Sequence, residues 1–100
     1  MTDTLTKEKT TTKDKILEPQ KYKVLLMNDN FTPMEFVIAL LVKVFRHSIP
    51  SAQEITMKVH NEGSGIAGIY SYEVAEQKGM EGTTLARQHG HPLVLKVEVL

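Results

Sequence analysis

The sequence predicts an α+β fold, a compact two-layer sandwich in which three helices cover one face of a three-stranded antiparallel sheet. Its apolar positions change between a period of two residues and a helical period, which gives the order β-α-α-β-α-β. Turn and cap residues separate these segments. The chain has 100 residues, 41% hydrophobic and 24% charged, and such a chain buries one modest core.

The first part of the chain differs in composition from the rest. Residues 1–19 contain six threonines, four lysines and four acidic residues, and too few apolar residues to offset the entropy cost of ordering. We therefore predict a disordered N-terminal extension over residues 1–19 and a folded domain over residues 20–100. The extension is either dispensable or a flexible arm with its own function.

A strand and a polar turn open the predicted domain. Tyr22-Lys-Val-Leu-Leu-Met27 is rich in residues that favour strands. Asn28-Asp29-Asn30 follows, and asparagine and aspartate favour turns. A strand over residues 22–27 is the expected result.

The start signals of a first helix follow in register. In Phe31-Thr-Pro-Met-Glu-Phe36, the two phenylalanines occupy the positions of a hydrophobic staple. We expect Thr32 to be the N-cap, Pro33 to be the first helical residue and Glu35 to complete a capping box. The helix continues through residues 37–45, which are apolar on nearly all sides and so predict burial against the sheet.

A second capping box predicts the second helix. Ser51-Ala-Gln-Glu54 has the required spacing, and the helix is expected to reach about Asn61 and to stop at Gly63. Residues 65–70 then form a short apolar run, which predicts the second strand.

The last helix and strand complete the predicted order. The helix is expected over residues 71–89, with its first serine as the cap and Gly90 as its stop. Gly79 and Gly82 lie in its interior, where each costs about 1 kcal/mol relative to alanine. Residues 93–99 alternate in the manner of a final strand.

Composition excludes several classes of function. Twelve basic residues balance twelve acidic ones, so the chain lacks the positive surplus of a general nucleic-acid or polybasic membrane binder. The absence of cysteine removes disulfides, thiol nucleophiles and thiolate metal sites, and fits a reducing compartment. No apolar run approaches the roughly 20 residues of a membrane span. No signal peptide is predicted, because the N-terminus has no apolar core, and no Arg-rich transit peptide is predicted, because the first arginine is Arg46.

The sequence contains no motif typical of a metal site or of a catalytic site. None of His47, His60, His89 and His91 forms an H-x-x-x-H pair, and no cluster of histidines and carboxylates is evident. Gly63-Ser-Gly65 lacks the P-loop lysine, and no nucleophile-elbow motif is present. We predict no enzyme activity, no catalytic residue, no metal and no cofactor.

One polar cluster nevertheless predicts a binding site. Residues 28–30 lie between a buried strand and a buried helix, where a polar tripeptide is most often only a turn. Thr56 and His60 share one face of the second helix, being four residues apart. If that helix packs beside the turn, an Asn, an Asp and a His converge, with Met34 and Val37 as apolar walls. Acceptors at the rim of an apolar hole suit a ligand with an ammonium group and a hydrophobic side chain.

Four motifs resemble those of the ClpS adaptors, and they follow in order over about Tyr22–Leu100. The ten-residue core of the first, N-D-x-x-T-P-M-E-F-V, is specific on its own. The four motifs are Tyr22-Lys-Val-Leu-Leu-Met-Asn-Asp-Asn-Phe-Thr-Pro-Met-Glu-Phe-Val37; Val59-His60 followed by Gly63; Gly68-Ile-Tyr-Ser-Tyr-Glu-Val-Ala-Glu76 with Lys78; and Ala86-Arg87 followed by His91-Pro-Leu93.

The resemblance implies a non-enzymatic adaptor, with residues 20–100 as its N-degron-binding domain. ClpS adaptors bind proteins with N-terminal Leu, Phe, Tyr or Trp and deliver them to the AAA+ unfoldase ClpA, which feeds the ClpP peptidase. The implied partners are the N-terminal domain of a ClpA-type unfoldase and N-degron substrates, with neither nucleic acid nor membrane. The implied location is the bacterial cytoplasm.

The resemblance also implies a role for particular residues. The family positions that bind the N-terminal amine match Asn28, Asp29 and His60. The family positions that line the hydrophobic pocket match Asn30, Thr32, Met34, Val37, Thr56, Val59 and Leu93. The family positions that dock the unfoldase match Phe31, Glu73 and Lys78.

This sequence departs from the family pattern at three places. The family often has Asp where Asn30 stands, and a pocket methionine falls on Thr56, with Met57 turned about 100° away along the helix. Gly79 and Gly82 occupy positions that are usually more apolar. A plain protein-interaction domain without a pocket remains the alternative, and a peptide with a free N-terminal Leu discriminates the two.

Overall fold

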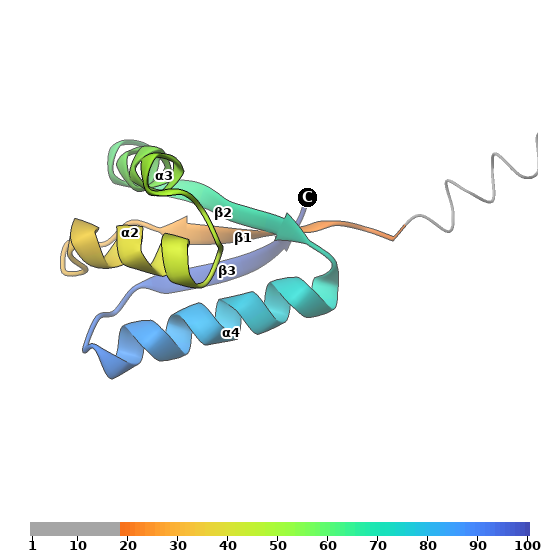
Figure 1. Ribbon diagram of the computed structural model, residues 1–100. Helices are drawn as coiled ribbons and strands as arrows, with labels where there is room; N and C mark the ends of the chain where they lie inside the picture. The colour runs from red at the N-terminus through yellow and green to blue at the C-terminus, as the bar shows by residue number, and fades with distance from the viewer. Residues whose placement is uncertain (1–18) are drawn as a thin grey trace, which may run out of the picture.

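The computed structural model describes residues 19–100, so the extension predicted over residues 1–19 lies almost wholly outside the described residues. Three strands and three helices alternate in the predicted order (Figure 1). They are β1 (Tyr22–Met27), α2 (Met34–Lys43), α3 (Ile49–Glu62), β2 (Ser64–Tyr70), α4 (Tyr72–Gln88) and β3 (Val94–Val99).

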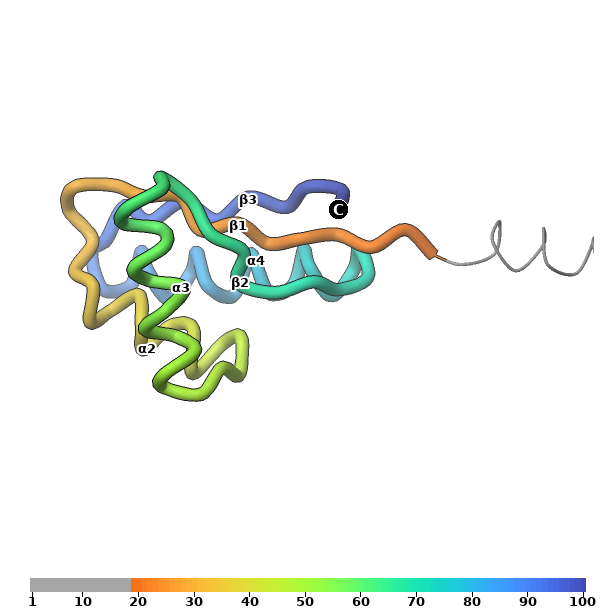
Figure 2. The backbone as a smooth tube through the Cα atoms, turned by 90° about the horizontal axis from the view of Figure 1, so that it is seen from above, coloured from red at the N-terminus to blue at the C-terminus, as the bar shows by residue number. Residues whose placement is uncertain are grey.

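The sheet has the order β2-β1-β3, and both pairs of strands are antiparallel. Tyr22 at the start of β1 lies opposite Tyr70 and Val99, while Met27 at its end lies opposite Ser64 and Val94. The three helices lie on one face of the sheet, as Figures 1 and 2 show from two directions. The predicted α+β sandwich is therefore confirmed.

The core lies between the sheet and the helices. Val24 and Leu26 of the central strand are fully buried, which follows from the alternation of faces along a strand. Leu40 and Leu41 of α2 are fully buried against them. Within residues 19–100 no helix is long and apolar enough to cross a membrane.

Two predicted helix starts are wrong. The N-cap of α2 is Pro33, because Thr32 is held in the preceding loop by the carboxylate of Asp29, so no capping box forms. The N-cap of α3 is Ser48, whose hydroxyl oxygen accepts a hydrogen bond from the backbone N–H of Ser51. Pro50 fits this earlier start, because the first helical turn does not need its missing N–H.

The predicted end of α3 is confirmed, and that of α2 is not. α3 ends at Gly63, whose φ of +93° is the left-handed conformation that glycine adopts without strain. α2 ends at Lys43 rather than extending to Phe45, although Val44 and Phe45 remain buried in the core.

Close packing of α4 on β3 explains the glycine at position 82. A Cβ atom there would lie 2.6 Å from Cδ2 of Leu95, closer than van der Waals contact permits. Glycine thus lets α4 approach β3 closely, and its low helix propensity is offset by this packing.

Candidate functional site

The candidate site forms where the end of β1 meets the end of α3. The backbone N–H of Asn28 donates a hydrogen bond of 2.9 Å to the carbonyl of Gly63. Gly63 caps α3, and its own N–H bonds to the carbonyl of Val59 at 3.0 Å. His60 lies in this last turn of α3 and is exposed, as is Asn28. The fold therefore brings the segment of Asn28 beside the turn that carries His60, which is the packing on which the predicted site depends.

Asp29 builds the loop between β1 and α2. Its Oδ1 accepts hydrogen bonds from the backbone N–H groups of Phe31 (2.8 Å) and Thr32 (2.7 Å). Its Oδ2 accepts one from the Thr32 hydroxyl at 2.8 Å. Such a ring of bonds is typical of aspartate in a turn. The carboxylate therefore sets the shape of the loop, in line with the turn preference of aspartate on which the sequence analysis relied.

Two opposing effects act on the pKa of Asp29. Partial burial raises it, but the hydrogen bonds from Thr32 and Phe31 and the nearby charge of His91 lower it, and the net pKa is below the ordinary value of 3.8. The loop therefore carries a negative charge at neutral pH, next to the exposed side chain of Asn28.

The residues expected to line the hydrophobic pocket differ in burial. Among the residues expected to line the pocket, four belong to the buried interior: Val37, Thr56, Val59 and Leu93. Three lie nearer the surface: Asn30, Thr32 and Met34. The expected lining therefore divides into an apolar interior and a more polar, partly exposed rim.

Thr56 is 3% exposed, and its hydroxyl donates to the carbonyl of Ala52 at 2.7 Å. The hydroxyl is thus satisfied by its own helix. Met57 is 47% exposed and lies on the outer side of α3, in agreement with the predicted rotation along the helix.

His91 also lies near the loop, and sequence analysis did not place it there. Its ring contacts that of Phe36 with 4.6 Å between centroids, and its charge lowers the pKa of Asp29 together with the hydrogen bonds. Arg87 holds the segment before β3, because its Nη1 donates to the carbonyls of His91 (2.8 Å) and Leu93 (2.9 Å). The resemblance of His91-Pro-Leu93 to a family motif was the available signal.

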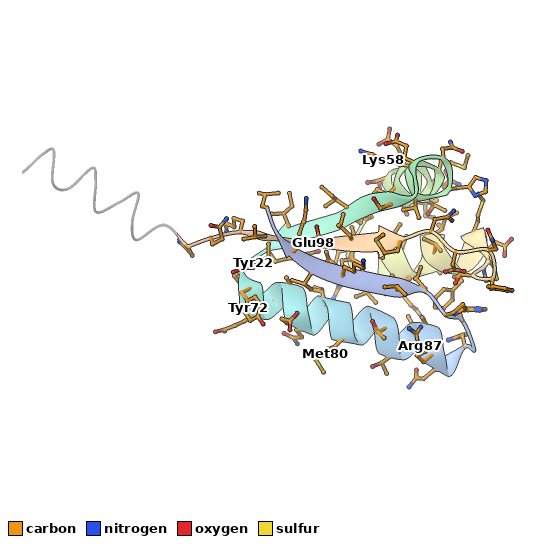
Figure 3. All side chains as sticks on the ribbon, turned by 180° about the vertical axis from the view of Figure 1, so that it is seen from behind. Tyr22, Lys58, Tyr72, Met80, Arg87 and Glu98 are labelled. Atoms are coloured by element: carbon orange, nitrogen blue, oxygen red, sulfur yellow. The ribbon has the colours of Figure 1, made fainter. Side chains whose placement is uncertain are left out.

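The residues expected to dock an unfoldase do not share one end of the molecule. Glu73 lies in the first turn of α4, where the neighbouring Tyr72 contacts Tyr22 with 5.0 Å between ring centroids (Figure 3). Phe31 is 79% exposed and follows the other end of β1, which is about 17 Å long at 3.3 Å per residue. Lys78 lies on α4 with Glu73, but its Nζ donates to the carbonyl of Val44 at 2.7 Å.

Two of the histidines, His47 and His89, bond to groups outside the candidate site. The ring nitrogens of His47 bond to the Ser51 hydroxyl (Nδ1, 3.0 Å) and to the carbonyl of Ala67 (Nε2). Nδ1 of His89 bonds to the carbonyl of Leu85 at 3.0 Å. Across residues 19–100, no three potential metal-ligating side chains come together.

Comparison with known proteins assigns a class and then a family. The chain is 48% identical over 81 residues to the "ATP-dependent Clp protease adapter protein ClpS" of Zymomonas mobilis, an alignment that covers 81% of this chain and 76% of the relative. It is 47% identical over 76 residues to the protein of the same name from Helicobacter hepaticus, covering 76% of this chain and 77% of the relative. These relatives define a class of protein that serves an ATP-dependent protease as an adaptor.

The family model described as "ATP-dependent Clp protease adaptor protein ClpS" matches residues 17–96. A solved structure of similar fold is that of Agrobacterium tumefaciens ClpS2 bound to L-phenylalaninamide. Its TM-score is 0.81 and its identity 37%, and the superposition covers 83% of this chain and 100% of that chain. The chain belongs to the ClpS family.

Proposed function

We propose that this chain binds proteins whose first residue is Leu, Phe, Tyr or Trp and delivers them to ClpA for degradation by ClpP. The observation that carries the proposal is the hydrogen bond from Asn28 to Gly63, which joins the polar loop to the last turn of α3. The ligand bound to the Agrobacterium relative supports it, because L-phenylalaninamide has both a free amine and an aromatic side chain.

The N-terminal ammonium of the substrate is a donor of three hydrogen bonds and needs acceptors. In the proposal, the amide oxygen of Asn28 and a ring nitrogen of His60 supply them at the exposed rim. Asp29 adds negative charge and holds the loop, because its oxygens already accept three hydrogen bonds. The amine is therefore recognised by both geometry and charge.

The first side chain of the substrate enters the apolar interior in this proposal. Val37, Val59, Leu93 and the methyl group of Thr56 provide apolar surface, and burying a Leu or Phe side chain contributes about 1.5–3 kcal/mol. Met34 at the rim narrows the entrance near the substrate backbone, which disfavours β-branched residues such as Ile and Val.

Delivery requires contact with the unfoldase. We assign this contact to Glu73 and Lys78 on α4 and to the exposed ring of Phe31 as a separate point of contact. The N-terminal extension engages the unfoldase during transfer of the substrate. The bacterial cytoplasm is the proposed location.

A degradation assay tests the whole proposal. The reporter is a folded protein that begins with Phe, and its matched control begins with Ala. In the presence of ClpA, ClpP and ATP, the chain is expected to accelerate loss of the Phe reporter only. A chain lacking residues 1–17 should bind a Phe peptide normally but fail to accelerate degradation. Equal acceleration of both reporters contradicts the proposed recognition, and full delivery by the truncated chain contradicts the role of the extension.

A further inference from the structure

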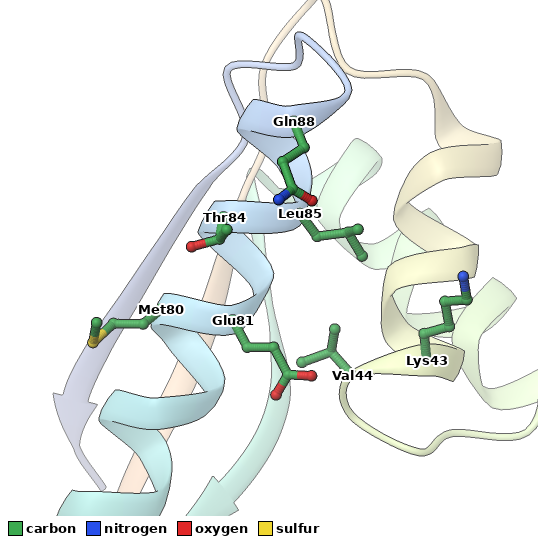
Figure 4. A pocket seen from close by; sticks show the side chains of 7 residues that line it. All are labelled: Lys43, Val44, Met80, Glu81, Thr84, Leu85 and Gln88. Carbon is green, nitrogen blue, oxygen red and sulfur yellow. The ribbon is translucent and has the colours of Figure 1, made fainter.

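An open groove with a volume of about 560 Å³ lies between the end of α2 and the second half of α4 (Figure 4). None of its lining residues belongs to the candidate site described above. Val44, Met80 and Leu85 supply apolar surface, while Lys43 on α2 and Glu81 on α4 carry charge. We refer to this feature as the α2–α4 groove.

The walls of the α2–α4 groove are fixed before any partner arrives. The ammonium of Lys78 binds the carbonyl of Val44 at 2.7 Å and so ties the end of α2 to α4. Val44 itself is buried. On its other side α4 is packed closely on β3 through Gly82. Because both elements are already fixed, binding in the groove requires little loss of conformational entropy.

The α2–α4 groove suits a side chain of another protein better than a small ligand. Five of its seven lining residues are exposed, so it is open to solvent, whereas small-molecule sites bury most of the ligand. Met80 is 71% exposed, and its flexible side chain is of the kind enriched at protein interfaces.

Two opposite charges border this apolar surface. The side chain of Glu81 extends from α4 toward Val44, whereas the ammonium of Lys43 points away from it, and both residues are exposed (Figure 4). A partner that matches this order carries an acidic group, an apolar side chain and a basic group in sequence across the groove. The reverse order places like charges together.

We propose that the α2–α4 groove receives an apolar side chain of the N-terminal domain of ClpA, flanked by an acidic residue that faces Lys43 and a basic residue that faces Glu81. The identity of the partner rests on the proposed function. Glu73 and Lys78 lie on the same helix as Glu81, so the groove continues the proposed docking surface along α4. Val44 and Leu85 provide apolar surface between the two charges, and Met80 lies beyond Glu81 on α4 (Figure 4).

The test measures the affinity of the isolated ClpA N-terminal domain for the full chain and its variants by calorimetry. Lys43→Glu and Glu81→Lys should each weaken binding about tenfold or more, because each brings like charges together. The double swap keeps the net charge of the chain but reverses the order of the two charges, so its binding should remain weak. Met80→Glu should weaken binding as well, and the control Lys96→Glu, on the uncovered face of β3, should not.

A second measurement on the same variants keeps failure of the groove distinct from failure of the proposed function. Every variant should bind a peptide with N-terminal Phe as the unmodified chain does, which also shows that it is folded. If the groove variants bind the ClpA domain like the unmodified chain, or if the double swap restores binding, the groove proposal is overturned and the proposed function stands. If the unmodified chain binds no ClpA domain, the proposed delivery function itself fails, and the groove proposal fails with it.

Discussion

Replacing Asp29 perturbs the loop on which the amine site depends. The carboxylate accepts two backbone hydrogen bonds and one from the hydroxyl of Thr32. Asp29→Ala removes all three acceptors at once. Asp29→Asn keeps one oxygen acceptor but loses the second oxygen and the charge. The two variants therefore separate the shape of the loop from its charge.

The expected magnitude follows from the exposure of the three donors. Loss of a side-chain cap on backbone N–H groups typically costs about 1 kcal/mol and at most about 2 kcal/mol. The N–H of Phe31 is exposed and can bond to water, whereas the two donors of Thr32 are partly buried. We expect Asp29→Ala to lower the free energy of unfolding by about 1–2 kcal/mol and Asp29→Asn by about half as much.

The contribution of the Asp29 carboxylate to the free energy of unfolding depends on pH. The pKa of Asp29 in the folded state lies below its ordinary value of 3.8, so the ionised form stabilises the folded state above that pH. This contribution is lost as the pH falls below 3.8 through the lowered pKa. The stability difference between the unmodified chain and Asp29→Asn should therefore narrow at the acid end.

Urea unfolding and titration with a Phe peptide measure both effects. The control is Glu54→Ala, which removes an exposed carboxylate on the outer side of α3. Asp29→Ala is expected to unfold at lower urea and to bind the peptide at least about tenfold more weakly, a loss of about 1.4 kcal/mol. A variant that matches the unmodified chain in both measurements refutes the role assigned to the Asp29 carboxylate.

Three further substitutions have defined outcomes. Gly82→Ala should destabilise the protein by about 1 kcal/mol. Overpacking against Leu95 costs about 1–3 kcal/mol, which exceeds the gain in helix propensity of about 1 kcal/mol. An unchanged urea midpoint contradicts this expectation. Lys78→Met should lower the melting temperature through loss of the bond to Val44, by more than the exposed control Lys96→Met, and equal melting temperatures for the two variants refute that role. Thr56→Met should raise the ratio of affinities for N-terminal Leu over Val, and an unchanged ratio shows that the side chain at 56 does not face the bound residue.

The order and type of the elements could be predicted from the sequence because each segment has a strong apolar period. The start of α3 was harder to predict, because Ser48 and Ser51 lie three residues apart and both are residues that favour the N-cap position. The turn before α3 decides between them, with Arg46 at a φ of +62° and Ser48 in an extended conformation. Such a backbone geometry is a tertiary result and leaves no local pattern.

The composition of the candidate site was more predictable than its internal bonding. A polar tripeptide after a strand and a histidine in the last turn of a helix are visible in the sequence. The bond from Lys78 to Val44 spans 34 positions, and the effect of the His91 charge on Asp29 likewise joins distant segments. Helix propensity predicts a cost for glycine at position 82, but the close approach of Leu95 that favours glycine there exists only in the folded sheet.

The central claim is that the free N-terminal amine of a substrate is recognised together with its first side chain. The most direct measurement compares the affinity of the chain for two peptides that begin with Phe and differ only in N-terminal acetylation. Acetylation removes a charged donor and leaves acceptors at Asn28 and His60 unpaired, and a charged hydrogen bond contributes about 1.5–3 kcal/mol. We expect the acetylated peptide to bind at least about 100-fold more weakly. Equal affinities for the two peptides would contradict the account.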